Sequence, residues 1–186
     1  MSSTRGRPHA SSREMLADAA CELFLERGYE ATSVTEVTRR AGVSRSSFFN
    51  YFASKSEILW YVFDRRIAAL DAALAEASVP VTTALRVFAS GEHPDALALA
   101  VAEARTMGVE DELAAGRAER QLRIADLVGA RLRRDGVDAL VAEIQAAGYA
   151  AALVSTVWRW AHLGAGRHQL NALLLESLGA ADTVFA

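Results

Sequence analysis

The residues best suited to chemistry lie in a short segment that begins at Gly42. Gly42 favours the left-handed backbone that ends a helix, and Ser44 is a good N-cap for the next one. So short a connection between two helices is typical of a helix-turn-helix. On the second helix Phe48 and Phe52, four residues apart, share one face. The opposite face carries Arg45, Ser46, Phe49 and Asn50. This mixture suits a DNA groove better than plain water, so we interpret the helix as a recognition helix.

The helices that would position this segment are marked by three Ser-x-x-Glu patterns, Ser11 with Glu14, Ser33 with Glu36 and Ser54 with Glu57. In such a capping box the serine oxygen accepts from the backbone three residues on, and the glutamate accepts from the serine's own N–H. Each pattern precedes an apolar-periodic stretch. The sequence therefore predicts helices over about 13–27 and 34–40, and a long helix that starts after Ser54 and continues to about 77.

Residues 11–60 resemble the DNA-binding domain of the TetR family of bacterial transcriptional regulators. The resemblance is carried by Gly28-Tyr29, Thr32-Ser33-Val34, Ala41-Gly42-Val43-Ser44, and Phe52-Ala53-Ser54-Lys55 followed by Ile58 and Leu59. It implies an all-α protein in which a flexible basic arm (1–10) precedes a three-helix helix-turn-helix DNA-binding domain (11–56). A helical effector-binding and dimerisation domain (57–186) would follow.

The resemblance and the residue types together suggest the DNA contacts. Arg45 is suited to guanine or phosphate, since bidentate contact to guanine is the commonest specific use of arginine. Phe49 stands where the family usually has a phosphate-binding tyrosine, so Tyr51 is expected to take over that bond. Lys55 matches a family phosphate contact at a helix amino end, where an anion is favoured. The predicted set is Thr32, Ser33, Ser44, Arg45, Ser46, Ser47, Phe49, Asn50, Tyr51 and Lys55.

The basic arm contains Arg5-Gly6-Arg7-Pro8, which resembles the arms that enter a minor groove. Its composition fits a disordered tail without DNA contact equally well.

Composition and charge restrict the remaining possibilities. The chain has 186 residues, 52% of them hydrophobic and only three of them proline, which favours a helical protein with a substantial core. Cys21 is the single cysteine, so no intramolecular disulfide forms, and no metal cluster is apparent. Residues 1–70 contain ten basic and eight acidic residues (+2), whereas 71–186 contain ten and fifteen (−5). Phosphate contacts need only a locally positive patch.

A cytoplasmic location is expected from the absence of an apolar leader after Met1. The longest window without a charged residue, 144–158, is also shorter than the roughly 18 residues of a membrane helix.

Beyond the DNA-binding domain, turn signals at Val79-Pro80, Pro94, Met107-Gly108 and Asp135-Gly136 divide the chain into further helices. We predict helices over 110–134, 137–163 and 167–178. The terminal Arg131, Arg133 and Arg134 suit a solvated helix carboxyl end. The apolar stripe of Leu170, Leu173, Leu174 and Leu178 suggests burial by a partner chain. The family resemblance implies a homodimer through the last two helices.

An apolar effector pocket behind the long helix is a further implication of the resemblance, with core packing as the competing interpretation. Its predicted walls are Trp60, Phe63, Ile67, Leu85, Phe88, Met107, Leu127, Tyr149 and Trp158. The effector would be a small hydrophobic or amphipathic molecule. The run from Phe48 to Phe52 and its continuation also resemble the branch associated with mycofactocin gene clusters, for which an acyl-coenzyme A is one effector class.

These observations favour a homodimeric repressor released from its operator when an effector tilts the long helix. The alternatives are a transcriptional activator, or a helical adaptor that has lost DNA binding. No Gly-rich phosphate loop, nucleophile elbow or metal-ligand cluster is present in the sequence, so we expect no enzyme, catalytic residue or cofactor.

Overall fold

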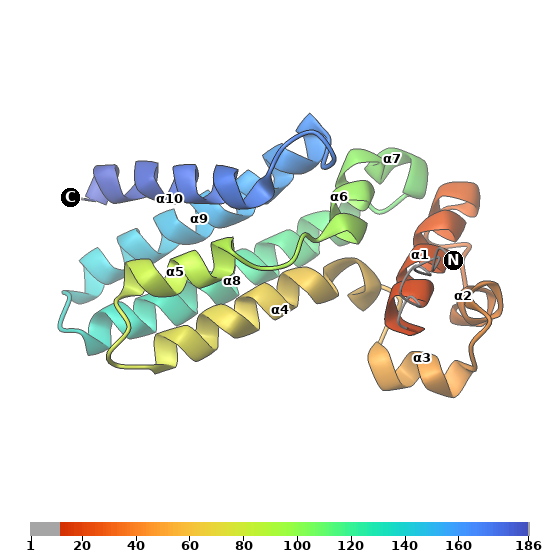
Figure 1. Cartoon of the computed structure of the whole chain (residues 1–186), viewed down its shortest axis with the longest axis horizontal. Coiled ribbons are helices and arrows are strands. Elements are labelled where there is room, and N and C mark those ends of the chain that lie inside the picture. The colour runs from red at the N-terminus through yellow and green to blue at the C-terminus, as the bar shows by residue number, and fades with distance from the viewer. Residues whose placement is uncertain (1–11, 186) are drawn as a thin grey trace, which may run out of the picture.

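The computed structural model describes residues 12–185, which form ten α-helices and no β-strand (Figure 1). The all-α prediction is confirmed. Three helices stand at one end of an elongated bundle formed by the other seven. They are α1 (Ser12–Arg27), α2 (Val34–Ala41) and α3 (Arg45–Tyr51). The predicted cap at Ser11 and the basic arm lie outside the described residues.

The connection between α2 and α3 forms for the reasons expected from the sequence. Ser33 and Glu36 make the complete capping box at the start of α2. Gly42 ends that helix with φ of 68°, in the left-handed region. The Ser44 hydroxyl then caps α3 by accepting from the Ser47 N–H at 3.0 Å. Two helices separated by three residues must cross steeply, which leaves one side of α3 open to solvent.

The long helix α4 (Glu57–Ala75) begins two residues later than predicted. The Ser54 hydroxyl accepts from the Glu57 N–H at 3.3 Å, as a cap should. The Glu57 carboxylate, however, accepts from the Ala53 N–H and not from that of Ser54. This half of the predicted capping box is therefore wrong by one residue.

The bundle contains α4 and the six helices that follow it. They are α5 (Val81–Ala89), α6 (Asp95–Ala102), α7 (Ala104–Met107), α8 (Glu110–Arg134), α9 (Ala139–Leu163) and α10 (Leu170–Phe185). Helix α9 is central, because it packs on α8, α10 and α6. Helices α1 and α6 are also in contact, and one continuous apolar core runs from the three-helix end into the bundle.

Arg131 corrects one prediction, because its side chain is 3% exposed and not solvated. Its guanidinium donates to the carbonyl oxygens of Leu74 and Glu76 at 2.9 and 3.0 Å, and to those of Ala77 and Val79 at 3.2 and 2.7 Å. These oxygens belong to the end of α4 and the connection to α5. The arginine thus supplies hydrogen bonds to the carbonyls of Ala77 and Val79, and it is a second donor to those of Leu74 and Glu76, which also accept from Arg134 and from the Val79 N–H.

The leucine stripe of α10 is also placed differently from the prediction. Leu170 and Leu174 are fully buried and Leu178 is 3% exposed, all within one subunit. Helix α10 packs on α9 and α5, which accounts for this burial. Only Leu173 is half-buried. Three of the four leucines therefore need no partner chain to cover them, and that inference from the stripe was wrong.

By length and composition α9 is the one described helix that is apolar enough to cross a membrane. The uncharged sequence window 144–158 is shorter than α9 because it is bounded by the charged Glu143 and Arg159, which both lie within this helix. The inner side of α9 is buried against neighbouring helices, with Leu153, Val157 and Trp160 fully covered. The helix is apolar because it forms the centre of the bundle.

Candidate nucleic-acid interface

Helix α3 is held to the protein by one aromatic face and presents the other to solvent. Phe48 is fully buried, and its ring centroid lies 5.7 Å from that of Phe52. On the opposite face Phe49 is 51% exposed and Tyr51 is 39% exposed. Two large aromatic side chains left in water next to polar groups are unusual on a short helix. The exposed side of α3 thus has the character of a binding surface.

The serines at the start of α3 form a compact hydroxyl cluster. The Ser44 oxygen lies 2.8 Å from the oxygens of both Ser46 and Ser47. Because Ser44 also caps the helix, its oxygen is already occupied. Ser46 is exposed. Short side chains here allow an approaching surface to come close to the helix backbone, as a recognition helix requires in a major groove.

Arg45 is exposed on the first turn of α3, and its guanidinium carbon lies 5.7 Å from the Phe49 ring centroid. No acidic side chain pairs with it among the described residues. Its hydrogen-bond donors therefore remain available, while the contact with Phe49 limits the positions that the side chain samples. This is a suitable arrangement for contact with guanine or phosphate.

Two predicted contacts near the start of α2 differ in their exposure. Thr32 is 2% exposed, and its hydroxyl donates to the Gly28 carbonyl at 2.8 Å. A side chain turned into the core does not reach a phosphate, so the expected hydroxyl contact from Thr32 is at odds with this structure. Ser33 is exposed, although its hydroxyl is part of the capping box.

Lys55 also points into the protein. Its Nζ donates to the Tyr29 carbonyl at 2.6 Å and lies 4.0 Å from the Tyr29 ring centroid. A weaker contact at 3.4 Å reaches the Thr32 carbonyl. The ammonium therefore braces the α1–α2 connection against the residues before α4. At most one of its three N–H donors is left for a phosphate.

Arg13 is a residue near this surface that the sequence did not reveal. Its guanidinium carbon lies 5.3 Å from the ring centroid of Tyr51, 5.5 Å from that of Tyr61 and 6.0 Å from that of Phe52. The cation thus links α1 to the end of α3 and to α4. It also places positive charge beside the exposed ring of Tyr51. Tyr51 and Tyr61 lie 38 and 48 positions after Arg13, so no local sequence signal connects them with it.

A second overlooked cation is Arg39, which is exposed in the last turn of α2 and makes no ion pair among the described residues. Its neighbour Arg40 is committed to α1, where it contacts Glu22 and Glu26 at 3.0 and 2.8 Å. The hydrogen bond from Arg40 lowers the pKa of Glu26 below its ordinary value. Both arginines are exposed, so ion pairing distinguishes them, and the sequence does not.

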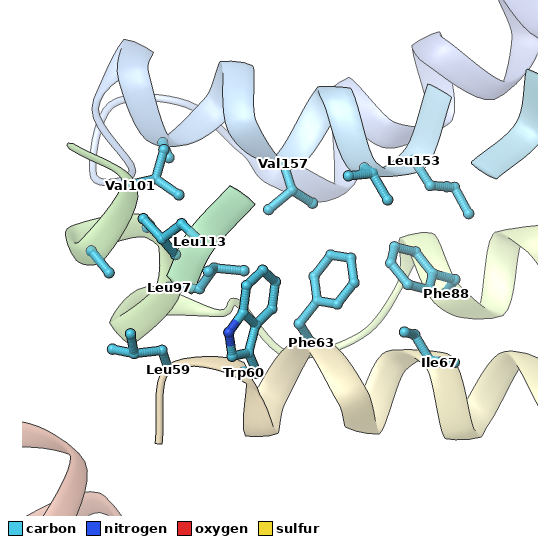
Figure 2. Close-up of a cluster of buried hydrophobic side chains, with 14 of the residues drawn as sticks. Leu59, Trp60, Phe63, Ile67, Phe88, Leu97, Val101, Leu113, Leu153 and Val157 are labelled. Atoms are coloured by element: carbon cyan, nitrogen blue, oxygen red, sulfur yellow. The ribbon is translucent and has the colours of Figure 1, made fainter. Parts of the chain in front are cut away.

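The predicted effector residues do not gather around one open cavity. Trp60, Phe63, Ile67, Leu85, Phe88 and Met107 are all buried. Figure 2 shows Trp60, Phe63, Ile67 and Phe88 packed side by side, and the Phe63 and Phe88 centroids are 5.5 Å apart. Tyr149 lies elsewhere and donates to Asp182 at 2.7 Å, while Leu127 is half-buried. Of the nine, Trp158 lines a surface hollow.

Direct contacts join the three-helix end to the bundle. The Tyr29 N–H donates to the carbonyl of Met107 at 2.7 Å, at the end of α7. The Ser56 hydroxyl, just before α4, donates to Glu112 on α8. A displacement of α7 or of the start of α8 would therefore be transmitted to the residues that support α3.

Among the described residues, no group of acidic, histidine or cysteine side chains is arranged to hold a metal.

Comparisons with known proteins agree with this geometry. The model of the family described as "Bacterial regulatory proteins, tetR family" matches residues 16–62. The putative mycofactocin biosynthesis transcriptional regulator MftR of Mycobacterium tuberculosis is 36% identical over 69 residues. This match covers 37% of the chain but only 35% of MftR, about a third of that relative's length. The transcriptional repressor Rv1474c of the same organism is 28% identical over 125 residues, covering 67% of the chain and 66% of the relative.

Among solved structures, the dihydroxyacetone kinase operon activator DhaS superimposes with a TM-score of 0.57. The superposition covers 94% of this chain and 96% of DhaS at 16% sequence identity. At that identity the likeness concerns the fold alone. It extends over both the three-helix end and the bundle.

Proposed function

We propose that this protein, which belongs to the TetR family of bacterial transcriptional regulators, binds operator DNA through α3 and represses transcription until an effector releases it. The observation that carries the proposal is the exposed face of α3. There Arg45, Ser46, Phe49, Asn50 and Tyr51 are open to solvent on a helix anchored from behind by Phe48. The proposed contacts also include Ser33 and Ser47. We add Arg39 to the proposed DNA contacts. Lys55 acts mainly by holding the α1–α2 connection against the residues before α4.

The proposed operator-binding unit is a homodimer formed through α9 and α10. A shallow hollow on this helix pair is lined by the apolar Leu173 and Ala180 and by the charged Arg159 and Glu176. A two-fold axis there would allow Arg159 of each copy to meet Glu176 of the other. Two recognition helices would then have to be about 34–36 Å apart to read successive major grooves.

The proposed effector is a small hydrophobic or amphipathic molecule, with an acyl-coenzyme A as one class. It releases DNA by binding better to a state in which α4 is tilted and the recognition helices are misplaced. A hundredfold loss of operator affinity requires a coupling free energy of roughly 2.7 kcal/mol. We place the protein in the cytoplasm, where its DNA target lies.

The test is fluorescence anisotropy of the full chain on DNA from upstream of its own gene, compared with the variants Arg45→Ala and Arg123→Ala. Arg123 is an exposed arginine on α8, remote from α3, so it controls for the loss of one positive charge. Arg45→Ala should weaken specific binding by about 1–3 kcal/mol, roughly five- to 150-fold, and relax sequence preference. Equal affinities for the two variants would contradict the assignment of α3.

The direction of regulation needs a separate measurement. A reporter gene behind the bound DNA distinguishes repression, in which deletion of the regulator raises expression, from activation, in which deletion lowers it. A chain that binds none of the DNA upstream of its own gene or neighbouring genes would instead support the adaptor alternative. The 28% identity with a repressor over two thirds of the chain is the reason to favour repression.

A further inference from the structure

A surface hollow of about 370 Å³ lies where α6 and α7 meet α8 and α9. Its apolar walls include Val101 and Leu113, and its polar groups include Arg117 and His162. Trp158 forms one side. Small-molecule sites commonly occupy about 300–1,000 Å³ and combine an apolar lining with a few polar groups. The hollow is large enough for part of a small ligand and has the appropriate composition.

Arg117 is held within this hollow without an acidic partner. Its guanidinium carbon lies 4.8 Å from the Trp158 ring centroid, and one of its nitrogens donates to the Ser155 hydroxyl at 3.2 Å. Arg120, one turn further along α8, makes two bonds of 2.7 and 2.8 Å to Asp64. Glu110 also lines the hollow, but its carboxylate pairs with Arg105 at 3.9 Å, and no carboxylate of the described residues forms an ion pair with Arg117. A half-buried, oriented and uncompensated guanidinium is suited to binding an anion.

Trp60 lies in the layer beneath this lining. Its ring centroid is 5.8 Å from that of Trp158, and its six-membered ring lies against Gly116, the residue before Arg117. Trp60 is fully buried, yet its indole N–H has no acceptor among the described residues. An unpaired buried donor is costly. The layer beneath Arg117 thus contains a buried indole N–H without an acceptor among the described residues.

A second hollow of about 340 Å³ continues along the same groove between α8 and α9. Its lining is mainly apolar and consists of Ala118, Leu122, Ala125, Ala147 and Ala150, with Gln121 as the one polar side chain. Ala118 follows Ala114 of the first hollow by one helical turn. Leu122 is 64% exposed, so covering this groove would remove apolar surface from water. From Arg117 to Ala125 the groove extends for roughly 12 Å along α8.

We propose that this groove binds an aliphatic carboxylate, with the carboxylate on Arg117 and the chain lying along Ala118 and Leu122. This inference rests on the proposed function in one respect, namely that the bound molecule acts as the effector. The first hollow also touches Ala104 of α7 and Glu110 at the start of α8. Those segments carry Met107 and Glu112, whose bonds to Tyr29 and Ser56 support the DNA-binding domain.

The test is calorimetric titration of the full chain with dodecanoate below its micelle concentration, and with 1-dodecanol as the uncharged analogue. We expect saturable binding of dodecanoate that is at least tenfold tighter than that of dodecanol. Arg117→Gln should weaken dodecanoate binding tenfold or more and leave dodecanol unchanged. Leu122→Gln should weaken both ligands. The matched control Arg123→Gln should change neither.

Equal dodecanoate affinity in Arg117→Gln and Arg123→Gln, or equal affinity of wild type for dodecanoate and dodecanol, would overturn the site. A circular dichroism spectrum of each variant ensures that a lost signal is not lost folding, and Leu122→Gln tests the groove independently of charge. Operator anisotropy is measured on the same samples. Binding of dodecanoate without operator release would overturn only its role as effector. Failure of the ligand-free protein to bind operator would count against the proposed function and leave the titration result standing.

Discussion

The ammonium of Lys55 donates to the carbonyl oxygen of Tyr29 at 2.6 Å and lies above the Tyr29 ring, 4.0 Å from its centroid. The N–H of the same Tyr29 donates to Met107 at the end of α7. Tyr29 is therefore fixed on one side by the residues before α4 and on the other by the bundle. This residue is therefore one of the links between the three-helix end and the bundle.

Lys55→Ala should weaken DNA binding on all sequences, mainly because the domain loses its brace. Removing a charged hydrogen bond and a cation–π contact from a half-buried position should lower the free energy of unfolding by about 1.5–3 kcal/mol. Urea denaturation measures this loss, and anisotropy on operator and scrambled DNA measures the binding. If DNA affinity falls while the unfolding free energy is unchanged, Lys55 acts as a phosphate contact and the brace is unimportant.

Arg131→Met should be strongly destabilising, because it removes the donor of the Ala77 and Val79 carbonyls and one of the two donors to each of the Leu74 and Glu76 carbonyls. Loss of a buried charged group with several partners typically costs about 3–5 kcal/mol. Arg133→Met is the control, since Arg133 is exposed on the same helical turn. A thermal unfolding temperature that is equally affected in the two variants would show that the buried bonds contribute little.

The sequence predicted local features well because their causes are local. The α2–α3 turn follows from Gly42 and Ser44, and the predicted helix 110–134 matches α8, since Gly108 and Gly136 adopt positive φ on either side of it. Arg131 and Lys55 were misjudged for a physical reason. The backbone carbonyls that Arg131 binds lie 52 to 57 residues before it, and the Tyr29 carbonyl that Lys55 binds lies 26 residues before it. Only the folded chain shows that these charges are turned inward.

The same limitation applies to the candidate site. The exposed face of α3 could be predicted from helical periodicity alone. By contrast, the contacts of the Arg13 guanidinium are with the rings of Tyr51 and Tyr61, which lie on the other helices α3 and α4. The predicted effector residues were apolar and aromatic, and such residues fill a core as readily as they line a pocket. In the described structure most of them are packed against each other.

Stability should fall at alkaline pH, first through Cys21. Burial raises the pKa of its thiol from 9.0 to about 12, with the Asp18 carboxylate adding to the effect. The folded state then holds a proton that the unfolded state loses, so the contribution is complete below pH 9 and decreases as pH rises toward 12. The slope approaches about 1.4 kcal/mol per pH unit between those values. Burial likewise raises the pKa of Tyr149 from 10 to about 12, which adds a loss above pH 10.

Urea denaturation at pH 8, 9.5 and 10.5 measures this dependence, with Cys21→Ala as the comparison. The variant should lose less stability than the wild type between pH 8 and 9.5, because it lacks the thiol whose ordinary pKa of 9.0 lies within that range. Parallel curves for the two proteins would show that the thiol ionises as easily in the folded state as in the unfolded one.

Gly116→Ala tests the contact between α8 and the aromatic layer. A Cβ at Gly116 would lie 2.5 Å from Cζ2 of Trp60, a fully buried indole that has no room to move. Overpacking of this kind should lower the free energy of unfolding by about 1–3 kcal/mol, despite the better helix propensity of alanine.

Gly179→Ala is the matched control, because nothing lies within 4 Å of its added methyl on α10. That variant should be more stable by up to about 1 kcal/mol. Since Trp60 supports Trp158, Gly116→Ala should also weaken dodecanoate binding, whereas Gly179→Ala should leave it unchanged. Opposite signs in the two unfolding curves would establish that the packing of Trp60, and not glycine flexibility, determines the residue at position 116.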